Sequence, residues 1–377
     1  MRAFSSALAL LGVASLVSAA SVNFKRYNVL SERSVPPLPD GMPNPSAEQL
    51  ADIEHKARGT LPNTPPPSHI SPEGITSLKL IAFNELFEVA YFNDLLLNVT
   101  NNVPGYEIED KDERNFVIKV LTAVLAQESL HALSANGALQ SVGVDPIQPC
   151  EYTFPVTDFK SAIALAGTFT AVVLGTLQDA VDNFAKGGDH DVARQIASVI
   201  GNEGEQEGWY RLLQNKIPNE LPFLTTSVLD FAFTAVQGFT VPGTCPNINE
   251  IPLKTFKPLT IVTPPGPKTQ EITISLNLKE VESLEAQLYG AAGDDDKSDE
   301  ERWWVTYINQ LNKPIVESLE PVKVEGDQIL ANTLFPYDEN LMNGLTIVAI
   351  TSNPGPFANA DEVVNSTYFG PGLIIVK

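Results

Sequence analysis

The chain has 377 residues, enough for two ordinary domains, and 43% of them are hydrophobic, which excludes a globally disordered protein. Its formal net charge of −22 argues against a nucleic-acid-binding protein, because a phosphate backbone is bound by clustered Lys and Arg. The charge is compatible with cation binding, although solubility alone accounts for it.

Residues 1–20 have the pattern of a secretory signal peptide. Arg2 supplies the positive charge, ALALLGVASLV is the apolar stretch, and VSAA provides the small residues of a cleavage site. The pair Lys25-Arg26 is either a dibasic processing site or a chance pair. We expect the mature protein to be secreted, with no membrane span and no lipid anchor in the rest of the chain.

Residues 21–72 are rich in Pro, Ser, Asn and Gly, and this composition predicts an extended, weakly ordered arm. Within the arm, residues 46–58 predict one short helix with Ser46 as its N-cap.

Residues 73–245 have the spacing of apolar side chains that is typical of a helical bundle. Four long helices and a shorter fifth one are predicted, over residues 74–98, 110–140, 157–186, 189–216 and 222–239. Asn, Pro and Gly separate these runs, and no heptad pattern is sustained long enough for a free coiled coil.

Residues 246–377 change to short β-rich runs separated by Pro, Gly, Asn and Asp. Six runs (LTIVT, EITISLNL, RWWVTYINQL, QILANTLF, LTIVAIT and LIIVK) predict a sandwich-like β domain. The acidic segment 290–301 lacks the regular ligand spacing of an EF-hand and is predicted to be a solvated loop. The expected fold class is therefore α+β, a helical bundle followed by a C-terminal β-rich domain.

If the chain is secreted, two cysteines and two sequons predict covalent modifications. Cys150 and Cys245 are the two cysteines of the chain, so an oxidising compartment favours one disulfide between them. Asn98 and Asn365 begin the sequons Asn-Val-Thr and Asn-Ser-Thr, which predict N-glycosylation of a secreted chain.

Acidic residues and a histidine accompany the apolar stripes of three predicted helices. Glu85 lies seven residues from Leu78 and from Phe92, and so shares their stripe. Side chains three apart on a helix project to one face, which applies to Glu128 with His131 and to Glu203 with Gln206. Carboxylates and an imidazole converging in this way could ligate one ion. The alternative is a hydrogen-bonded polar layer that specifies packing without a metal.

The segments FNELFEVAYFNDLL, LAQESLHALSANGAL and EGEQEGWYR make the chain resemble the ferritin-like superfamily. More closely, the whole chain resembles the secreted fungal late sexual development proteins, also grouped with nutrient-stress response proteins. The resemblance implies a four-to-five-helix bundle with an inward metal site. It also implies an extracellular or cell-wall location, with cell-wall or matrix components as partners.

Carried over residue by residue, the ferritin-like pattern matches Glu85, Glu128, His131 and Glu203. Two expected ligands are missing, because residues 161–178 contain no acid and Gln206 replaces a histidine. The resemblance therefore implies one divalent ion (iron, manganese or zinc), with Gln206 as a weak neutral ligand, rather than a metal pair.

Three functions are compatible with this sequence. The first is a secreted, non-catalytic ferritin-like protein of sexual development or stress response; the others are a metal-dependent oxidase or iron-handling enzyme, and a metal-sequestering protein. Three further acids, Glu88, Glu205 and Glu207, differ in helical phase from the named ligands, and we interpret them as surface or rim acids.

Overall fold

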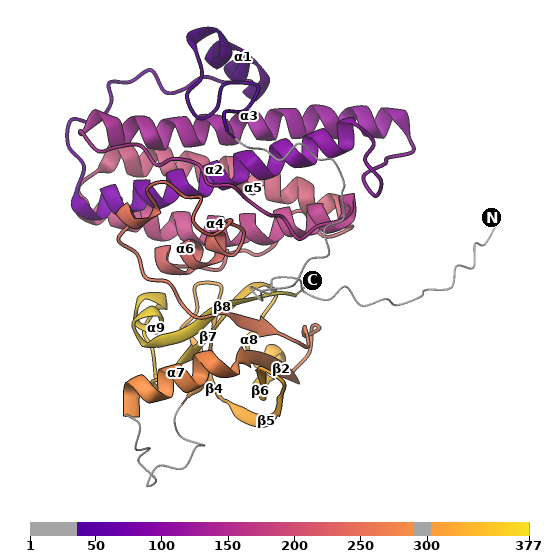
Figure 1. Ribbon diagram of the computed structural model, residues 1–377, viewed down its shortest axis with the longest axis vertical. Helices are drawn as coiled ribbons and strands as arrows, with labels where there is room; N and C mark the ends of the chain where they lie inside the picture. The colour runs from indigo at the N-terminus through magenta and orange to yellow at the C-terminus, as the bar shows by residue number, and fades with distance from the viewer. Residues whose placement is uncertain (1–35, 290–302, 377) are drawn as a thin grey trace, which may run out of the picture.

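The computed structural model describes residues 36–289 and 303–376 (Figure 1). The predicted signal peptide 1–20, the pair Lys25-Arg26 and the acidic segment 290–301 lie outside the described residues. A helical bundle lies against two antiparallel β-sheets, which confirms the α+β fold class.

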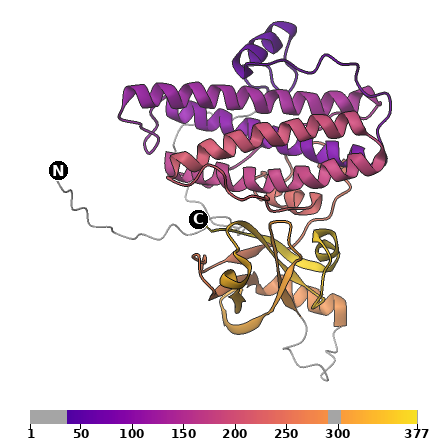
Figure 2. The same cartoon turned by 180° about the vertical axis from the view of Figure 1, so that it is seen from behind.

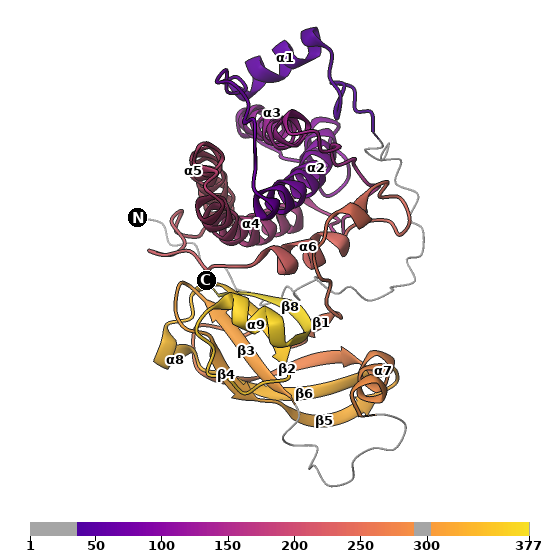
Figure 3. The same ribbon diagram turned by 90° about the vertical axis from the view of Figure 1, so that its left-hand side faces the viewer.

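Four long helices form the bundle, which Figure 3 shows close to end-on. They are α2 (Pro72–Thr100), α3 (Lys111–Ser141), α4 (Phe159–Gly187) and α5 (His190–Leu213). Side-chain caps fix three of their starting points, because Ser71, Asp110 and Asp158 each accept a hydrogen bond from an otherwise unpaired first-turn amide. The predicted helices are therefore confirmed to within a few residues at each end.

Two contacts between helix ends show how the four helices run. Ser71, just before α2, donates from Oγ to Oδ2 of Asp189, just before α5, at 2.6 Å. At the other end, the amide of Phe159 at the start of α4 donates to the carbonyl oxygen of Gly105, which precedes α3. α2 and α5 thus begin at one end and α3 and α4 at the other, so residues 142–158 cross the length of the bundle. A single long crossover is the connectivity of ferritin-like bundles.

Within the predicted arm, the described residues 36–71 differ from the extended, weakly ordered chain that its composition predicts. The expected helix is present as α1 (Ala47–Ala57), and it packs on α3. Its N-cap is confirmed, because Ser46 Oγ accepts from the amide of Gln49 at 3.3 Å in a capping box. The segment is held on the bundle by buried apolar side chains distributed along it, namely Leu38, Met42, Ile53 and Ile70.

The fifth helix, α6 (Leu229–Gln237), is shorter than the predicted run over residues 222–239. Before it, the chain is extended along α4, where the amide of Ser227 donates to the carbonyl oxygen of Gly175 at 3.2 Å. Gly175 permits this approach, because a Cβ there would collide with the carbonyl oxygen of Thr225. This backbone pairing replaces the first turns of the expected helix.

Eight strands in the described residues form two four-stranded antiparallel sheets. The outer sheet has the order β1-β2-β6-β5, with β1 (Leu259–Ile261), β2 (Gln270–Asn277), β6 (Gln328–Phe335) and β5 (Glu320–Glu325). The inner sheet has the order β4-β3-β7-β8, with β4 (Ile315–Ser318), β3 (Trp304–Asn309), β7 (Gly344–Thr351) and β8 (Thr367–Val376). The short helices are η1 (Ile248–Glu250), α7 (Leu278–Tyr289), α8 (Tyr337–Asn340) and α9 (Ala360–Ser366). The six predicted runs are strands, and β4 and β5 were not predicted.

The inner sheet lies between the bundle and the outer sheet, so β7 is buried along its whole length. Successive side chains of a strand point to opposite faces. Leu345, Ile347 and Ala349 belong to the core shared with the bundle, whereas Val348 and Ile350 belong to the core between the sheets. The inner sheet is therefore covered on both faces.

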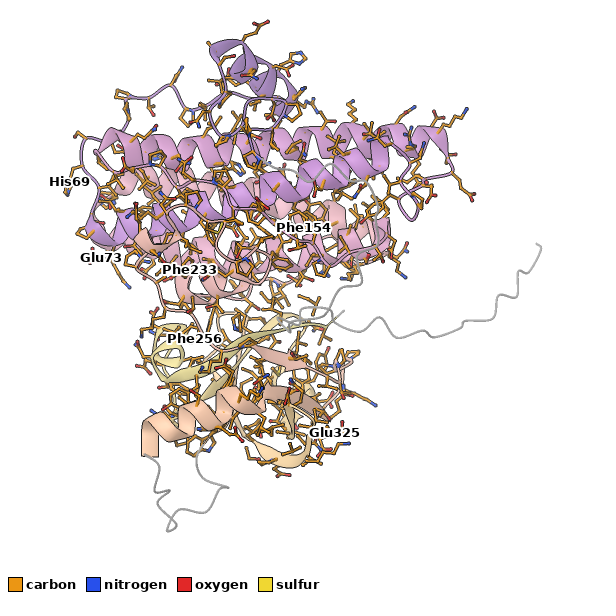
Figure 4. The ribbon with its side chains drawn as sticks, viewed as in Figure 1. His69, Glu73, Phe154, Phe233, Phe256 and Glu325 are labelled. Atoms are coloured by element: carbon orange, nitrogen blue, oxygen red, sulfur yellow. A yellow bond between two sulfur atoms is a disulfide. The ribbon has the colours of Figure 1, made fainter. Side chains whose placement is uncertain are left out.

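The junction between bundle and sheets is apolar and continuous. Figure 4 shows Phe256 between the two regions, and its ring centroid lies 5.4 Å from that of Phe231 in α6. Nearby, a disulfide joins Cys150 in the crossover to Cys245 after α6. The expected boundary between residues 245 and 246 thus separates helical from β-rich sequence, while one hydrophobic core extends across it.

Two of the described helices, α3 and α4, are long and apolar enough to cross a membrane by length and composition alone. In the structure, 50% and 78% of their most apolar stretches are buried inside the protein. The core helices of a bundle pass the same test, so the finding is weak evidence for a membrane span.

Candidate metal centre

Four side chains from three helices converge inside the bundle. α2 contributes Glu85, α3 contributes Glu128 and His131, and α5 contributes Glu203. One oxygen or nitrogen atom from each lies within 4.8 Å of the corresponding atoms of the others. The three glutamates are fully buried, and 14% of the His131 side chain is exposed.

His131 directs its Nδ1 atom at all three carboxylates. The distances are 3.0 Å to Glu128 Oε2, 3.5 Å to Glu85 Oε2 and 3.8 Å to Glu203 Oε1. Burial disfavours a charge on the ring, but Glu128 and Glu85 outweigh burial and hold the pKa of His131 well above its usual range. In the absence of a metal, the ring is thus the cation that partly offsets the acidic cluster.

Most carboxylate oxygens of the cluster accept no hydrogen bond from the described residues. Both oxygens of Glu85 and both oxygens of Glu203 are buried without a hydrogen-bond partner among the described residues. Burial raises the pKa of Glu85 to about 7, against the opposing effect of His131. Burial, followed by the charges of Glu128 and Glu88, raises the pKa of Glu203 well above its usual range. Such unpaired buried oxygens are costly unless a cation accompanies them.

Gln206 lies in the cluster but presents its nitrogen to it. Its Nε2 donates to Glu128 Oε1 at 2.6 Å and to Gln127 Oε1 at 3.2 Å, while its Oε1 accepts from Tyr210 Oη at 3.2 Å. The arrangement makes Gln206 a donor that orients Glu128. It differs from the expected role as a weak ligand, which would require the amide to turn its oxygen inward.

Two of the three supposed rim acids are buried. Glu88 is fully buried, Glu207 is 5% exposed, and Glu205 alone is exposed as expected. Helical phase placed them off the ligand stripe, but α2 packs against α3, α4 and α6, so a different face of α2 meets another helix rather than solvent. The interpretation of Glu88 and Glu207 as surface acids is therefore wrong.

Glu207 belongs to a separate ionic group at the junction with the β-sheets. Arg211 Nη1 lies 4.0 Å from Glu207 Oε1 and 3.3 Å from Glu220 Oε1, and all three side chains are almost fully buried. Burial and the charge of Glu220 raise the pKa of Glu207 to about 9. This group lies one helical turn beyond Glu203 along α5.

A cavity of about 350 Å³ adjoins the acidic cluster and includes Glu85 and His131 in its wall. Its remaining wall comes from α2, α3, α5 and the segment just after α1. Amides span the gap between α3 and α5, where Gln195 Nε2 bonds to Ser134 Oγ and Asn202 Nδ2 to Gln127 Oε1. Figure 2 shows α5 crossing this side of the bundle. A small molecule could reach the cluster by this route.

The fourth helix of the bundle contributes no acid to the cluster. The middle of α4 faces the core with apolar residues such as Phe169, which packs edge-on against Phe87 and Tyr91. Asp179, near the end of α4, accepts from the amide of Leu229 at 3.1 Å and so fixes the start of α6. The structure thus agrees with the lack of an acid in residues 161–178 of α4.

The predicted glycosylation sites differ in exposure. Asn365 is exposed in the last turn of α9, where its Oδ1 accepts from Lys254 Nζ at 3.3 Å. Asn98 is half-buried near the end of α2 and lines a small cavity with Tyr106. Both remain predictions, and the geometry favours Asn365.

Comparison with known families agrees with the geometry. Residues 79–216 match the family model described as a ferritin-like domain. All four converging side chains lie within that match, and so does Gln206. No curated protein matches the chain. The bundle is therefore similar to a ferritin-like domain over residues 79–216, and a pair of antiparallel sheets follows it.

Proposed function

We propose that this protein binds a divalent metal ion (iron, manganese or zinc) through Glu85, Glu128, His131 and Glu203. The observation that carries the proposal is the set of four buried oxygens on Glu85 and Glu203 that accept no hydrogen bond from the described residues, in a group whose ligand atoms, with those of Glu128 and His131, all lie within 4.8 Å of one another. Carboxylate and imidazole ligands suit all three metals. A bound ion would supply the positive charge that these oxygens lack and would polarise a molecule placed beside it.

Metal binding at this site involves the release of protons and a carboxylate that is already oriented. Metal ligands must be deprotonated, so binding releases the protons held by Glu85, Glu203 and His131. Gln206 supports the site by fixing one oxygen of Glu128 with its amide nitrogen.

For the biological role, we propose an exported, non-catalytic ferritin-like protein of development or stress response. The Cys150–Cys245 disulfide supports an oxidising compartment, in agreement with the signal peptide expected from the sequence. The resemblance to late sexual development proteins supports the developmental context and an extracellular or cell-wall setting.

A metal-dependent oxidase is the second candidate, and one observation favours it. The cavity of about 350 Å³ reaches Glu85 and His131, so a small reactant has a path to the metal position. A purely structural polar layer has no need of such access.

Metal analysis of the purified full chain tests the proposal. Iron, manganese and zinc per protein are measured after loading, in the native protein and in the Glu128→Ala/His131→Ala variant. Glu205→Ala is the matched control, since it removes an exposed acid from α5. We expect the native protein and the control to retain metal and the double variant to lose it. A native protein that takes up no metal under any loading condition would sink the proposal.

Oxygen uptake separates the two candidate roles. The loaded protein is mixed with ferrous iron in an oxygen-electrode cell. Steady metal-dependent oxygen consumption supports the oxidase, and binding without consumption supports the non-catalytic protein.

A further inference from the structure

A second cavity, of about 180 Å³, lies beside the C-terminal part of α2. Four segments meet there, namely α2, the loop before α3, the crossover and the start of α4. Its wall shares no residue with the acidic cluster or with the larger cavity. Asp94, which belongs to this wall, follows Glu85 by nine residues, a rise of roughly 13.5 Å along the helix axis. The cavity is therefore a site apart from the candidate metal centre.

Aromatic side chains form much of the cavity wall. Tyr91 comes from α2, Tyr106 from the loop before α3, and Tyr152 and Phe154 from the crossover. Figure 4 labels Phe154 at the side of the bundle. Its ring meets that of Tyr91 at 83° with centroids 4.9 Å apart, and it stacks on that of Tyr152 with centroids 6.1 Å apart. Aromatic rings that gather around one space are the wall of a cation–π site.

Two of the tyrosine hydroxyls are bonded to the backbone. Tyr91 Oη donates to the carbonyl oxygen of Ala162 at 2.6 Å. Tyr152 Oη accepts from the amide of Cys150 at 3.4 Å. These hydrogen bonds hold both rings in place and direct their hydroxyls at the protein.

The cavity has an acidic character. Among the described residues that line it, Asp94 is the only acid, and Lys, Arg and His are absent. A second acid, Asp158, is close by, because a Cβ at Gly105 would lie 3.3 Å from its Cβ, next to Tyr106. Burial, followed by the charges of Asp158 and Asp94, raises the pKa of Tyr106 to about 12, so this phenol is neutral. Carboxylates and neutral rings together attract a cation.

The crossover side of the wall is fixed by the chain that follows α6. The amide of Thr153 donates to the carbonyl oxygen of Phe239, and the amide of Val241 donates to that of Glu151, both at 2.8 Å. The disulfide joins the same two segments. A wall that is already in place loses little conformational freedom when a ligand binds.

We propose that this cavity binds an alkylated ammonium group, such as the trimethylammonium group of choline. Asp94 is the counter-ion, and the rings of Tyr106 and Phe154 contact the methyl groups. Such a cation donates no hydrogen bond, so it is recognised by aromatic rings and a nearby carboxylate. The volume of about 180 Å³ is below the roughly 300–1,000 Å³ of pockets for larger ligands, which limits the occupant to a small cation. The inference does not depend on metal binding.

The proposal has a consequence for the sequon at Asn98. The side chain of Asn98 lines the cavity, where a glycan would fill the space that the ligand needs. We therefore expect Asn98 to be unmodified in the exported protein, while the exposed Asn365 can carry a glycan. Mass spectrometry of the peptide that contains Asn98 measures this. Full occupancy of Asn98 by a glycan would overturn the inference.

Isothermal titration calorimetry of the full chain with choline chloride tests the binding directly. The comparison ligand is 3,3-dimethylbutan-1-ol, which has the shape of choline with carbon in place of the charged nitrogen. We expect the native protein to bind choline and not the neutral alcohol. Phosphatidylcholine vesicles are the second arm, because a lipid surface presents the same group. Cosedimentation with the vesicles would assign the lipid as the source, and choline binding without cosedimentation would assign a free small molecule.

Two variants and one control localise the binding. Asp94→Asn removes the counter-ion and should weaken choline binding by roughly tenfold or more. Phe154→Leu removes a ring and should weaken it roughly 2- to 30-fold. Asp145→Asn is the matched control, since it makes the same substitution at an exposed acid of the crossover, and its affinity should equal that of the native protein. Circular dichroism and thermal unfolding verify that each variant is folded.

Three results would overturn the inference: no binding of choline, equal binding of choline and the neutral alcohol, or equal affinities of the native protein and folded Asp94→Asn. If Asp94→Asn does not fold, the comparison of choline with the neutral alcohol in the native protein still decides. Each of these results leaves the proposed metal binding standing, because none of the measurements involves a metal.

Discussion

Replacing Glu85 by Gln should stabilise the metal-free protein while it weakens metal binding. The Glu85 carboxyl is fully buried, and burial raises its pKa to about 7 from the ordinary value of 4.5. The folded protein therefore holds a proton that the unfolded chain releases above pH 4.5. Between these two values, rising pH favours the unfolded chain. Glu85→Gln removes the titrating carboxyl group and keeps the size and shape of the side chain.

The size of the effect follows from the two pKa values. At about 1.36 kcal/mol for each pKa unit, the difference corresponds to about 3 kcal/mol of unfolding free energy above pH 7. The difference between the variant and the native protein should disappear below pH 4.5, where the carboxyl is protonated in both states. The shift in Tm is roughly 2–4 °C for each kcal/mol in a unit of 150–250 residues and smaller in a larger one, so we expect an increase below about 12 °C at pH 8.

Thermal unfolding in EDTA at pH 4.5, 6, 7 and 8 measures this difference directly. Adding Zn²⁺ at about 100 times its Kd should stabilise the native protein by about 2.7 kcal/mol. The variant lacks a ligand and should gain less, so the difference in unfolding free energy between the two proteins should become smaller. A variant that is less stable than the native protein in EDTA at pH 8 would refute the reasoning. So would a difference that is the same at pH 4.5 and at pH 8.

Three further predictions concern the scaffold. Removing the disulfide with Cys150→Ser and Cys245→Ser should lower the unfolding free energy by about 4–5 kcal/mol, since the bridge closes a loop of 95 residues, and urea denaturation without reductant measures the loss. Gly175→Ala should lower the unfolding free energy by about 1–3 kcal/mol, because the new Cβ collides with the extended chain beside α4. Gly137 has open space around it, so Gly137→Ala should raise the unfolding free energy by about 0.5–1 kcal/mol. Equal effects of the two substitutions in thermal unfolding would contradict this reasoning. Arg211→Met should cost about 3–5 kcal/mol, because it removes the cation that lies 3.3 Å from the buried carboxylate of Glu220, and a neutral result in urea denaturation would show that the two groups are not an ion pair.

The bundle was predictable because its information is local. Apolar spacing, caps and breakers along residues 74–216 define each helix without reference to its partners. The strand β5 was missed for the opposite reason, since all six of its residues are exposed and its pairing with β6 is what makes it a strand. The continuous apolar run of β7 did carry a usable signal. A strand without polar alternation is covered on both faces, as β7 is by the bundle and by the outer sheet.

The convergence of the acidic cluster was predictable, whereas the burial of Glu88 was not, and that failure has one physical cause. Glu85, Glu128 and His131 follow from spacing, but Glu88 was assigned to solvent because it lies off the stripe through Leu78 and Phe92. That stripe argument holds for a helix with one buried face. α2 is buried on almost all sides, because α3, α4 and α6 surround it. On such a helix, the angular position of a residue around the axis predicts which neighbouring helix it contacts. It does not predict whether the residue is exposed to solvent.

Among the described residues, the β-sheets do not line the cavity beside the cluster, and they meet the chain just after α5. The described residues that line the cavity lie between Ala57 and Asn202, so the sheets provide none of its wall. Contact with the sheets comes further along α5, where Arg211 pairs with Glu220. The side chain of Glu220 in turn lies against the start of β7, where a Cβ at Gly344 would come within 2.9 Å of its carboxyl carbon. Glu203 is two helical turns from Arg211, so the inner sheet fixes the end of the helix that carries this ligand. Because the buried core is shared across residue 245, the bundle and the sheets form one structural unit.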